Sequence, residues 1–374
     1  MTVGNRLMAS MRHRPPHGAI GTPRAIGSRY LLAIAVAVAG ASFLVFQAQT
    51  RREDPVAVLD PQTRWTWLGA HVHGTAVHSI AFSSDGKYLA TGDNDGIVNV
   101  WERSKERPIK ILDDHKRGGG DHRSVLTVAF DPNGSRLATG GFDGRIFLYG
   151  VPGFGRPVCL EGHKGAITSL AFSPDGQTLV SAGDQFDSTV RTWGVGTGKP
   201  IRSITAEKDH GYDQVAMNSE GRIVAIRGGW SGGKGMIELL GLDDLAVIVR
   251  KPGANFMTFA PSGRAFAAGD RSGLVTVCDA NNLAPILKGR PDPERILHPA
   301  LSPDASLLAF AFEETILDKG IVQLYELKTH RTRRLDLGRK NVVFSLSFSP
   351  DGRTLAAGCY GGQVALCPID VKDE

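Results

Sequence analysis

One short segment, GGWSGGKG from Gly228 to Gly235, contains the residue types of two catalytic motifs. The pattern G-x-S-x-G would present Ser231 as a nucleophile, and G-x-x-x-x-G-K would use Lys234 to bind phosphate. Both motifs need a helix after the turn, but the following residues, MIELLGLDD, fit a β-strand. The phosphate motif also has glycine where it needs Ser or Thr for Mg²⁺. The sequence therefore predicts no catalytic residue and no enzyme.

Histidines and acids gather in three places where metal binding could be considered. HVHGTAVH, residues 71–78, contains an HxH pair that could bind a metal from one strand. Strand alternation sends His78 to another side, however, and His73 has a structural role described below. DDHKRGGGDH, residues 113–122, surrounds a flexible glycine run, and DNDG, residues 93–96, is half a calcium loop placed in a turn. We expect no metal site and no cofactor.

The elements that would position these residues follow from a repeat. The segment AFSPDGQTLVSAG, residues 171–183, has six related copies along the chain. Their first strands end, 42 to 48 residues apart, at Phe82, Phe130, Phe172, Met217, Phe259, Leu301 and Phe348. A repeat of about 40–50 residues is typical of β-propellers. Within each copy the apolar residues alternate with period two, which indicates strands rather than helices.

The repeat count predicts an all-β fold with seven four-stranded antiparallel blades over residues 63–374. The seventh copy ends at VALCPIDVKDE, which supplies only its third strand. RWTWLGA, Arg64–Ala70, precedes the first copy and has the right alternation. We expect this segment to complete the last blade and close the ring, because closure removes exposed sheet edges.

Repeats 1 and 3 resemble the WD-repeat (β-transducin-type) family. The resemblance implies a His before the first strand, a Ser or Thr in the second, an Asp in the next turn and a Trp in the third. These side chains would form a buried hydrogen-bonded chain in each blade. The matching residues are His73, Thr91, Asp95 and Trp101 in repeat 1, and His163, Ser181, Asp187 and Trp193 in repeat 3.

The other repeats depart from this pattern. Repeat 2 keeps Thr139 and Asp143 with Tyr149 at the Trp place, but has Asp121 where His is expected. Repeats 4 to 7 lose most of the polar chain, and we expect apolar packing to replace it. Their residues at the Trp place are Leu240, Cys278, Tyr325 and Cys367. No CxxC pair occurs, so we expect all four cysteines to be single buried thiols.

The N-terminal residues differ in charge from the rest of the chain. Residues 1–52 hold seven Arg and no acid, so 36 of the 43 Lys and Arg face 38 Asp and Glu in the remainder. That near-neutral body argues against nucleic-acid binding. YLLAIAVAVAGASFLVFQA, residues 30–48, is uncharged and long enough to span a bilayer.

We therefore expect a basic disordered tail at 1–29, a signal-anchor helix at 30–48 and a linker at 49–62. The positive-inside bias would place the N-terminus in the cytoplasm and the propeller outside it. Cleavage of a signal peptide, with secretion of the propeller, is the alternative.

The family resemblance implies a scaffold that binds other proteins through loops on one face. Long loops there suggest four candidate residues, Arg123, Phe186, Trp230 and Lys234. The alternative is an extracytoplasmic ligand sensor or hydrolase-type propeller that uses its central channel. That reading would require polar or charged side chains from several blades to converge in the channel.

Overall fold

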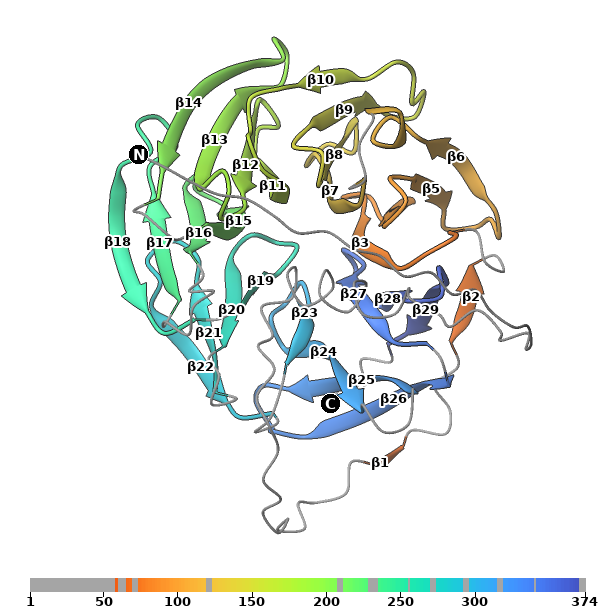
Figure 1. The fold of residues 1–374 in the computed structure, drawn as a ribbon. Coiled ribbons are helices and arrows are strands. Elements are labelled where there is room, and N and C mark those ends of the chain that lie inside the picture. Colours follow the sequence, from red (N-terminus) through yellow and green to blue (C-terminus); the bar gives the residue numbers. More distant parts are fainter. Residues whose placement is uncertain are drawn as a thin grey trace, which may run out of the picture. The chain divides into compact units, whose positions relative to one another are not determined.

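The computed structural model describes residues 58–59, 65–68, 73–118, 123–206, 211–227, 235–254, 256–269, 274–291, 296–314, 319–339 and 341–369. These residues form seven β-sheets, and each sheet is one blade of a propeller (Figure 1). Within them, the one helical segment is a short 3₁₀ turn at Lys116–Gly118, and no helix is long and apolar enough to cross a membrane. Residues 1–48, with the expected anchor, lie outside the described residues.

The strands of the first three blades follow chain order from the centre outwards. Blade 1 contains β3 (Val77–Phe82), β4 (Tyr88–Asp93), β5 (Val98–Glu102) and β6 (Pro108–Leu112). Blade 2 contains β7 (Val125–Phe130), β8 (Arg136–Gly141), β9 (Ile146–Gly150) and β10 (Val158–Leu160). Blade 3 contains β11 (Ile167–Phe172), β12 (Thr178–Gly183), β13 (Thr189–Gly194) and β14 (Lys199–Thr205).

Blades 4 to 6 repeat this order, and blade 6 has the longest strands. Blade 4 contains β15 (Tyr212–Met217), β16 (Ile223–Arg227), β17 (Met236–Leu240) and β18 (Val247–Pro252). Blade 5 contains β19 (Phe256–Phe259), β20 (Ala265–Gly269), β21 (Val275–Asp279) and β22 (Pro285–Gly289). Blade 6 contains β23 (Leu297–Leu301), β24 (Leu307–Glu314), β25 (Lys319–Glu326) and β26 (Thr332–Arg339).

Blade 7 closes the ring with a strand from the other end of the chain. It contains β27 (Val343–Phe348), β28 (Thr354–Cys359) and β29 (Val364–Pro368), and its fourth strand is β2 (Thr66–Leu68). β2 runs antiparallel to β29, with Thr66 opposite Leu366. Leu68 is buried beside Val364 in the core that blade 7 shares with blade 1. The predicted closing segment therefore has the predicted partner.

A second N-terminal strand, β1 (Val58–Leu59), falls in what the sequence suggested was only a linker. It runs parallel to β26, with Val58 opposite Arg333, and so adds a fifth strand to the outer edge of blade 6. No sequence pattern indicated this pairing, because two residues are too few to show a strand period.

The innermost strands hold neighbouring blades together (Figure 1). First strands of successive blades pack side by side at six junctions, including β27 against β3, where the ring closes. Between blades 4 and 5, Gln214 Oε1 accepts a hydrogen bond from the Met257 amide at 2.9 Å. Serine hydroxyls also donate to the next blade's backbone, as Ser345 does to the Val77 carbonyl at 3.0 Å. The ring is thus fastened by polar contacts as well as by apolar packing.

The turn between the first and second strands recurs with its own hydrogen bonds. In blade 3, the Ser173 hydroxyl donates to Asp175 Oδ1 at 2.5 Å, and the same carboxylate accepts from the Gln177 amide at 2.9 Å. Gly176 has a φ of 69°, a conformation that costs side-chain-bearing residues energy. Blade 6 places Ala305 at this position with a φ of 57°, and so carries local strain.

We predict that Ala305→Gly stabilises the propeller. Glycine removes the cost of the positive φ, which is about 1–2 kcal/mol, but it loses about 0.5–1 kcal/mol more backbone entropy on folding. The first effect is larger, so the free energy of unfolding should rise by about 0.5–1 kcal/mol. Urea denaturation measures the change. The matched control is Gly176→Ala, which meets nothing closer than 3.5 Å and should destabilise through φ alone. A loss of stability in Ala305→Gly would contradict the assigned turn.

Candidate functional site: the loop face and its supports

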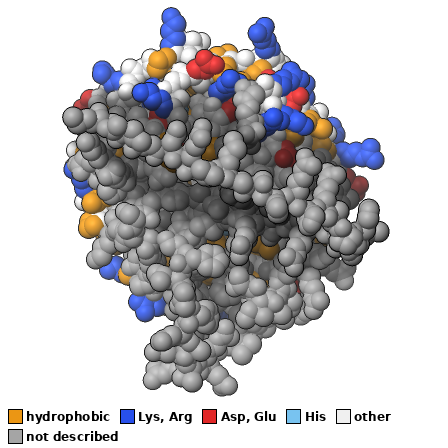
Figure 2. Space-filling view, in the orientation of Figure 1, with side chains coloured by type: hydrophobic (Ala, Val, Ile, Leu, Met, Phe, Trp, Pro, Cys, Tyr) orange, Lys and Arg blue, Asp and Glu red, His pale blue; other side chains and the backbone are white. Residues whose placement is uncertain are grey.

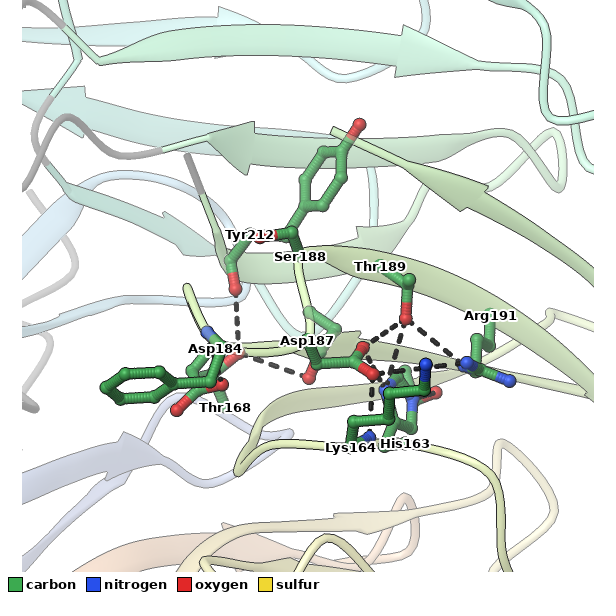
Figure 3. Close-up of polar contacts among 12 residues, drawn as sticks. His163, Lys164, Thr168, Asp184, Asp187, Ser188, Thr189, Arg191 and Tyr212 are labelled. Carbon is green, nitrogen blue, oxygen red and sulfur yellow. Dashed lines mark hydrogen bonds and ion pairs between the residues drawn. The ribbon is translucent and has the colours of Figure 1, made fainter. Parts of the chain in front are cut away.

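Blade 3 brings its four sequence-predicted network residues together. Figure 3 shows two of them, His163 and Asp187, with the other groups that surround Asp187. The Trp193 indole Nε1 donates to Ser181 Oγ at 2.8 Å, and Ser181 Oγ lies 2.6 Å from His163 Nε2. His163 Nδ1 lies 2.6 Å from Asp187 Oδ2. His163 precedes the first strand and Asp187 lies in the turn before β13, so the chain ties two loops to the sheet.

The direction of these hydrogen bonds follows from the groups at the two ends. Burial alone would raise the pKa of Asp187, but hydrogen bonds from His163, Thr189 and the Lys164 amide outweigh it and lower that pKa below its ordinary value. The carboxylate is therefore ionised and accepts a hydrogen bond from His163 Nδ1–H. His163 Nε2 then accepts from Ser181, whose oxygen accepts from the indole. Each donor has one acceptor, which a buried polar chain requires.

Blade 1 forms the same chain with a different acid. His73 Nε2 lies 2.7 Å from Thr91 Oγ1, to which the Trp101 indole donates at 2.9 Å. His73 Nδ1, however, lies 2.8 Å from Asp93 Oδ2. Asp93 is buried, whereas the predicted partner Asp95 is exposed. The assignment of Asp95 to this chain was wrong. Asp95 precedes Trp101 by the same number of residues as Asp187 precedes Trp193, but this spacing did not identify the carboxylate that contacts the His73 imidazole.

Blade 2 has a histidine that the sequence comparison missed. His115 Nδ1 lies 3.1 Å from Asp143 Oδ1, and its Nε2 lies 2.9 Å from Thr139 Oγ1. Asp121, which the sequence placed at the histidine position, lies outside the described residues. The histidine lies six residues earlier in the sequence than the spacing of the other repeats predicts, because the loop that enters blade 2 is longer. His115 therefore corrects the expectation that this repeat lacks its histidine.

Tyr149 replaces tryptophan in blade 2 and reaches a different partner. Its hydroxyl donates to Asp114 Oδ2 at 2.8 Å. Burial, together with the Asp114 carboxylate, raises the pKa of Tyr149 well above its ordinary value, so the phenol stays protonated and donates. The aromatic residue of this blade thus fixes the entering loop directly.

Blade 4 uses a polar set that sequence reasoning did not find. Glu238 is buried on β17, where its carboxylate accepts from the Tyr212 hydroxyl and from Arg250 Nε, each at 3.0 Å. Glu238 stands two residues before the Trp place, where blade 1 has Asn99. A glutamate on an alternating strand looks solvent-facing in sequence. Its burial depends on an arginine from the next strand, which spacing does not reveal.

The remaining blades fill the Trp place with side chains that pack in apolar cores. Cys278 lies in the core between blades 4 and 5, Tyr325 in that between blades 5 and 6, and Cys367 in that between blades 6 and 7. Cys359 is also buried, and burial raises the pKa of its thiol to about 12. Cys159 is exposed, so the expectation that all four thiols are buried was wrong.

The networks place two kinds of loop on one face of the ring, called here the loop face. It comprises the turns between second and third strands and the segments that enter the first strands. Four turns are hydrogen-bonded to the entering segment of their own blade in the same way, through the backbone amides of Asn94, Phe142, Asp184 and Tyr360. Phe186 and Tyr360 project from these turns with 76% and 51% of their surface exposed.

The predicted binding residues are only partly placed by the structure. Phe186 is exposed on the blade 3 turn. Arg123 is half-buried, and its carbonyl faces Gly96 of the blade 1 turn. Trp230 and Lys234, together with the rest of the GGWSGGKG segment up to Lys234, lie outside the described residues.

Innermost strands of three blades bring a histidine and aromatic cluster together. The ring of Phe344 lies 5.4 Å from that of His78 and 5.7 Å from that of His298, and Tyr360 packs at 5.8 Å. Burial lowers the pKa of His78, and it lowers that of His298 to about 4. Such weakly basic imidazoles suit packing better than general-base catalysis at neutral pH.

Comparison with known proteins finds one matching family model and several similar proteins. A family model described as WD domain, G-beta repeat matches residues 64–102, 107–150, 156–194 and 323–366. The chain is 29% identical over 161 residues to WD repeat-containing protein SL1-17 of Schistosoma mansoni, covering 42% of this chain and 45% of that protein. It is 33% identical over 137 residues to WD repeat-containing protein 1 of Gallus gallus, covering 35% and 21%.

A guanine nucleotide-binding protein subunit beta-like protein of Encephalitozoon cuniculi is 26% identical over 136 residues, covering 35% of this chain and 38% of that protein. The chain thus matches less than half the length of each of these relatives. The fold defines a closed seven-bladed β-propeller whose best-kept blades are fastened by a Trp–Ser/Thr–His–Asp chain. Together with the matches, this places the chain in the WD-repeat β-propeller family.

We predict that Asp93→Asn destabilises the protein far more than Asp95→Asn. The first change removes the buried carboxylate that accepts from His73 and should lower the free energy of unfolding by about 2 kcal/mol. The second changes an exposed side chain and should cost less than about 0.5 kcal/mol. Urea denaturation compares the two variants. Equal losses, or a larger loss for Asp95→Asn, would restore the original assignment.

Proposed function

We propose that this propeller is a scaffold that binds other proteins through its loop face and catalyses no reaction. The observation that carries the proposal is the pair of exposed aromatic side chains, Phe186 and Tyr360, on turns anchored to the sheets. Aromatic residues contribute large contact areas at interfaces, and rigid turns lose little entropy on binding.

The relatives support a role in assemblies. One similar protein is named guanine nucleotide-binding protein subunit beta-like protein, after a subunit of an assembly. The alternative use of the central channel by a sensor or hydrolase has weaker support. The side chains that meet on the innermost strands of blades 6, 7 and 1 are the Phe344 ring and the imidazoles of His78 and His298, and burial lowers the pKa of both histidines, which favours their neutral form.

We predict that Phe186→Ser combined with Tyr360→Ser reduces partner capture at least about tenfold, because interface aromatics are common hot spots. The measurement is crosslinked affinity capture of the full chain from its own cells, with quantitative mass spectrometry. The matched control combines Ile201→Ser with Ile248→Ser, two similarly exposed residues on outer strands. Equal loss in the control would contradict the loop face, and substrate turnover without a reproducible partner would contradict the scaffold.

We further propose that residues 30–48 anchor the chain in a membrane, with the N-terminus cytoplasmic and the propeller on the other side. The proposal is supported by the uncharged run itself and by five Arg before it against two Arg and two acids just after it.

Alkaline carbonate extraction of membranes tests the anchor with an N-terminally tagged chain. The intact, tagged protein should stay in the membrane pellet, because a bilayer-spanning segment resists release. A soluble propeller that has lost its tag would support signal cleavage and secretion instead.

A further inference from the structure

The N-terminal strand β1 connects the outer edge of blade 6 to the segment that leads towards the proposed anchor. Val58 and Leu59 pair with Arg333 and Arg334 of β26. Nine residues, 49–57, separate this pairing from the end of the apolar run at Ala48. A chain of that length reaches at most about 35 Å. Among the described residues, blade 6 is therefore the first part of the propeller with which the chain pairs after the proposed membrane span.

The edge of blade 6 beside β1 is basic. The turn between β25 and β26 carries Lys328 and Arg331, both of which are exposed. Neither has an ion pair within the part of the chain that the structure describes. Arg333 follows on β26, directly opposite Val58. Two acids, Glu326 and Asp336, flank these three basic residues. Glu326 accepts a hydrogen bond from the Thr329 hydroxyl, and Asp336 accepts one from the Gly338 amide.

Basic side chains also occur elsewhere on the outer surface, so charge alone does not single out blade 6. Lys and Arg side chains project along the outline of the molecule in Figure 2. On blade 1, however, Lys105 pairs with Glu102 and Arg103 with Asp351. On blade 3, Lys199 and Arg202 are exposed, but no N-terminal strand joins that blade. Blade 6 has cations that make no ion pair within the described residues. It also has a tether, which is the segment from residue 49 to strand β1 that connects it to the proposed span.

We propose that the basic edge of blade 6, defined by Lys328, Arg331 and Arg333, docks on an anionic lipid surface. This inference rests on the proposed membrane anchor. The tether would keep the edge within reach of the bilayer, and exposed Lys and Arg within about a Debye length of anionic headgroups are attracted to them in either leaflet. Docking would fix the angle of the propeller on the membrane and leave the loop face open to protein partners. A nucleic acid could satisfy the same charges, but the tether favours the lipid.

The test uses the full chain in lipid nanodiscs of phosphatidylcholine, with or without phosphatidylglycerol. A fluorophore on Thr329→Cys reports proximity to a quencher attached to a lipid headgroup. The exposed thiol is removed by Cys159→Ser, and the other three cysteines are buried. Quenching should be at least about twofold greater with the anionic lipid and should fall at high salt, because the attraction is screened. The double variant Lys328→Glu with Arg331→Glu should abolish that difference.

Two controls decide between docking and general charge attraction. The variant Lys199→Glu with Arg202→Glu makes the same charge change on blade 3 and should leave quenching at Thr329→Cys unchanged. A label on Thr197→Cys, in the corresponding turn of blade 3, should not respond to the anionic lipid. Equal quenching in both lipids, or equal effects of the two charge reversals, would overturn the proposal, as would a response only to added single-stranded DNA.

The anchor and the docking edge can fail separately. The same labelled protein is also reconstituted into vesicles and extracted with carbonate. This measurement tests the anchor independently of the fluorescence result. Release from the vesicles overturns the anchor and, with it, the docking edge. Retention combined with lipid-independent quenching overturns the docking edge alone.

Discussion

In blades 1 to 3, the loops of the loop face depend on a buried chain of hydrogen bonds whose members must all have partners. In blade 3 the chain runs from the Trp193 indole through Ser181 and His163 to the Asp187 carboxylate. A buried polar group without a partner costs about 1–3 kcal/mol, so every member constrains the next. Because the two ends of the chain lie in different loops, satisfying it also sets where those loops lie.

The sequence predicted the architecture well because the fold repeats one strand pattern seven times. The period of two, the glycine turns and the unpaired last strand were enough to place β2 beside β29. Prediction was weaker within the networks. Asp93 and Asp95 are two residues apart, and only the path of the turn decides which carboxylate lies behind His73. His115 was missed because loop length moves a residue in sequence without moving it in space.

Blades 4 to 7 show that the propeller does not require the same side-chain network in each blade. Blade 4 replaces the chain with a buried Glu238 held by Tyr212 and Arg250. Blade 7 uses an apolar core around Cys367. Sequence could suggest that the polar chain was lost, but it could not show the glutamate, whose partners come from β15 and β18. What recurs, at six of the seven junctions, is the side-by-side packing of innermost strands.

The pairing of β2 with β29 has a consequence for biosynthesis. Thr66 leaves the ribosome 300 residues before its partner Leu366. At synthesis rates of about 5–20 residues per second, the first strand waits for roughly 15–60 s without its native neighbour. During that interval an unpaired strand and an open blade edge are exposed to aggregation. The nascent chain is therefore most vulnerable to aggregation until its final blade emerges.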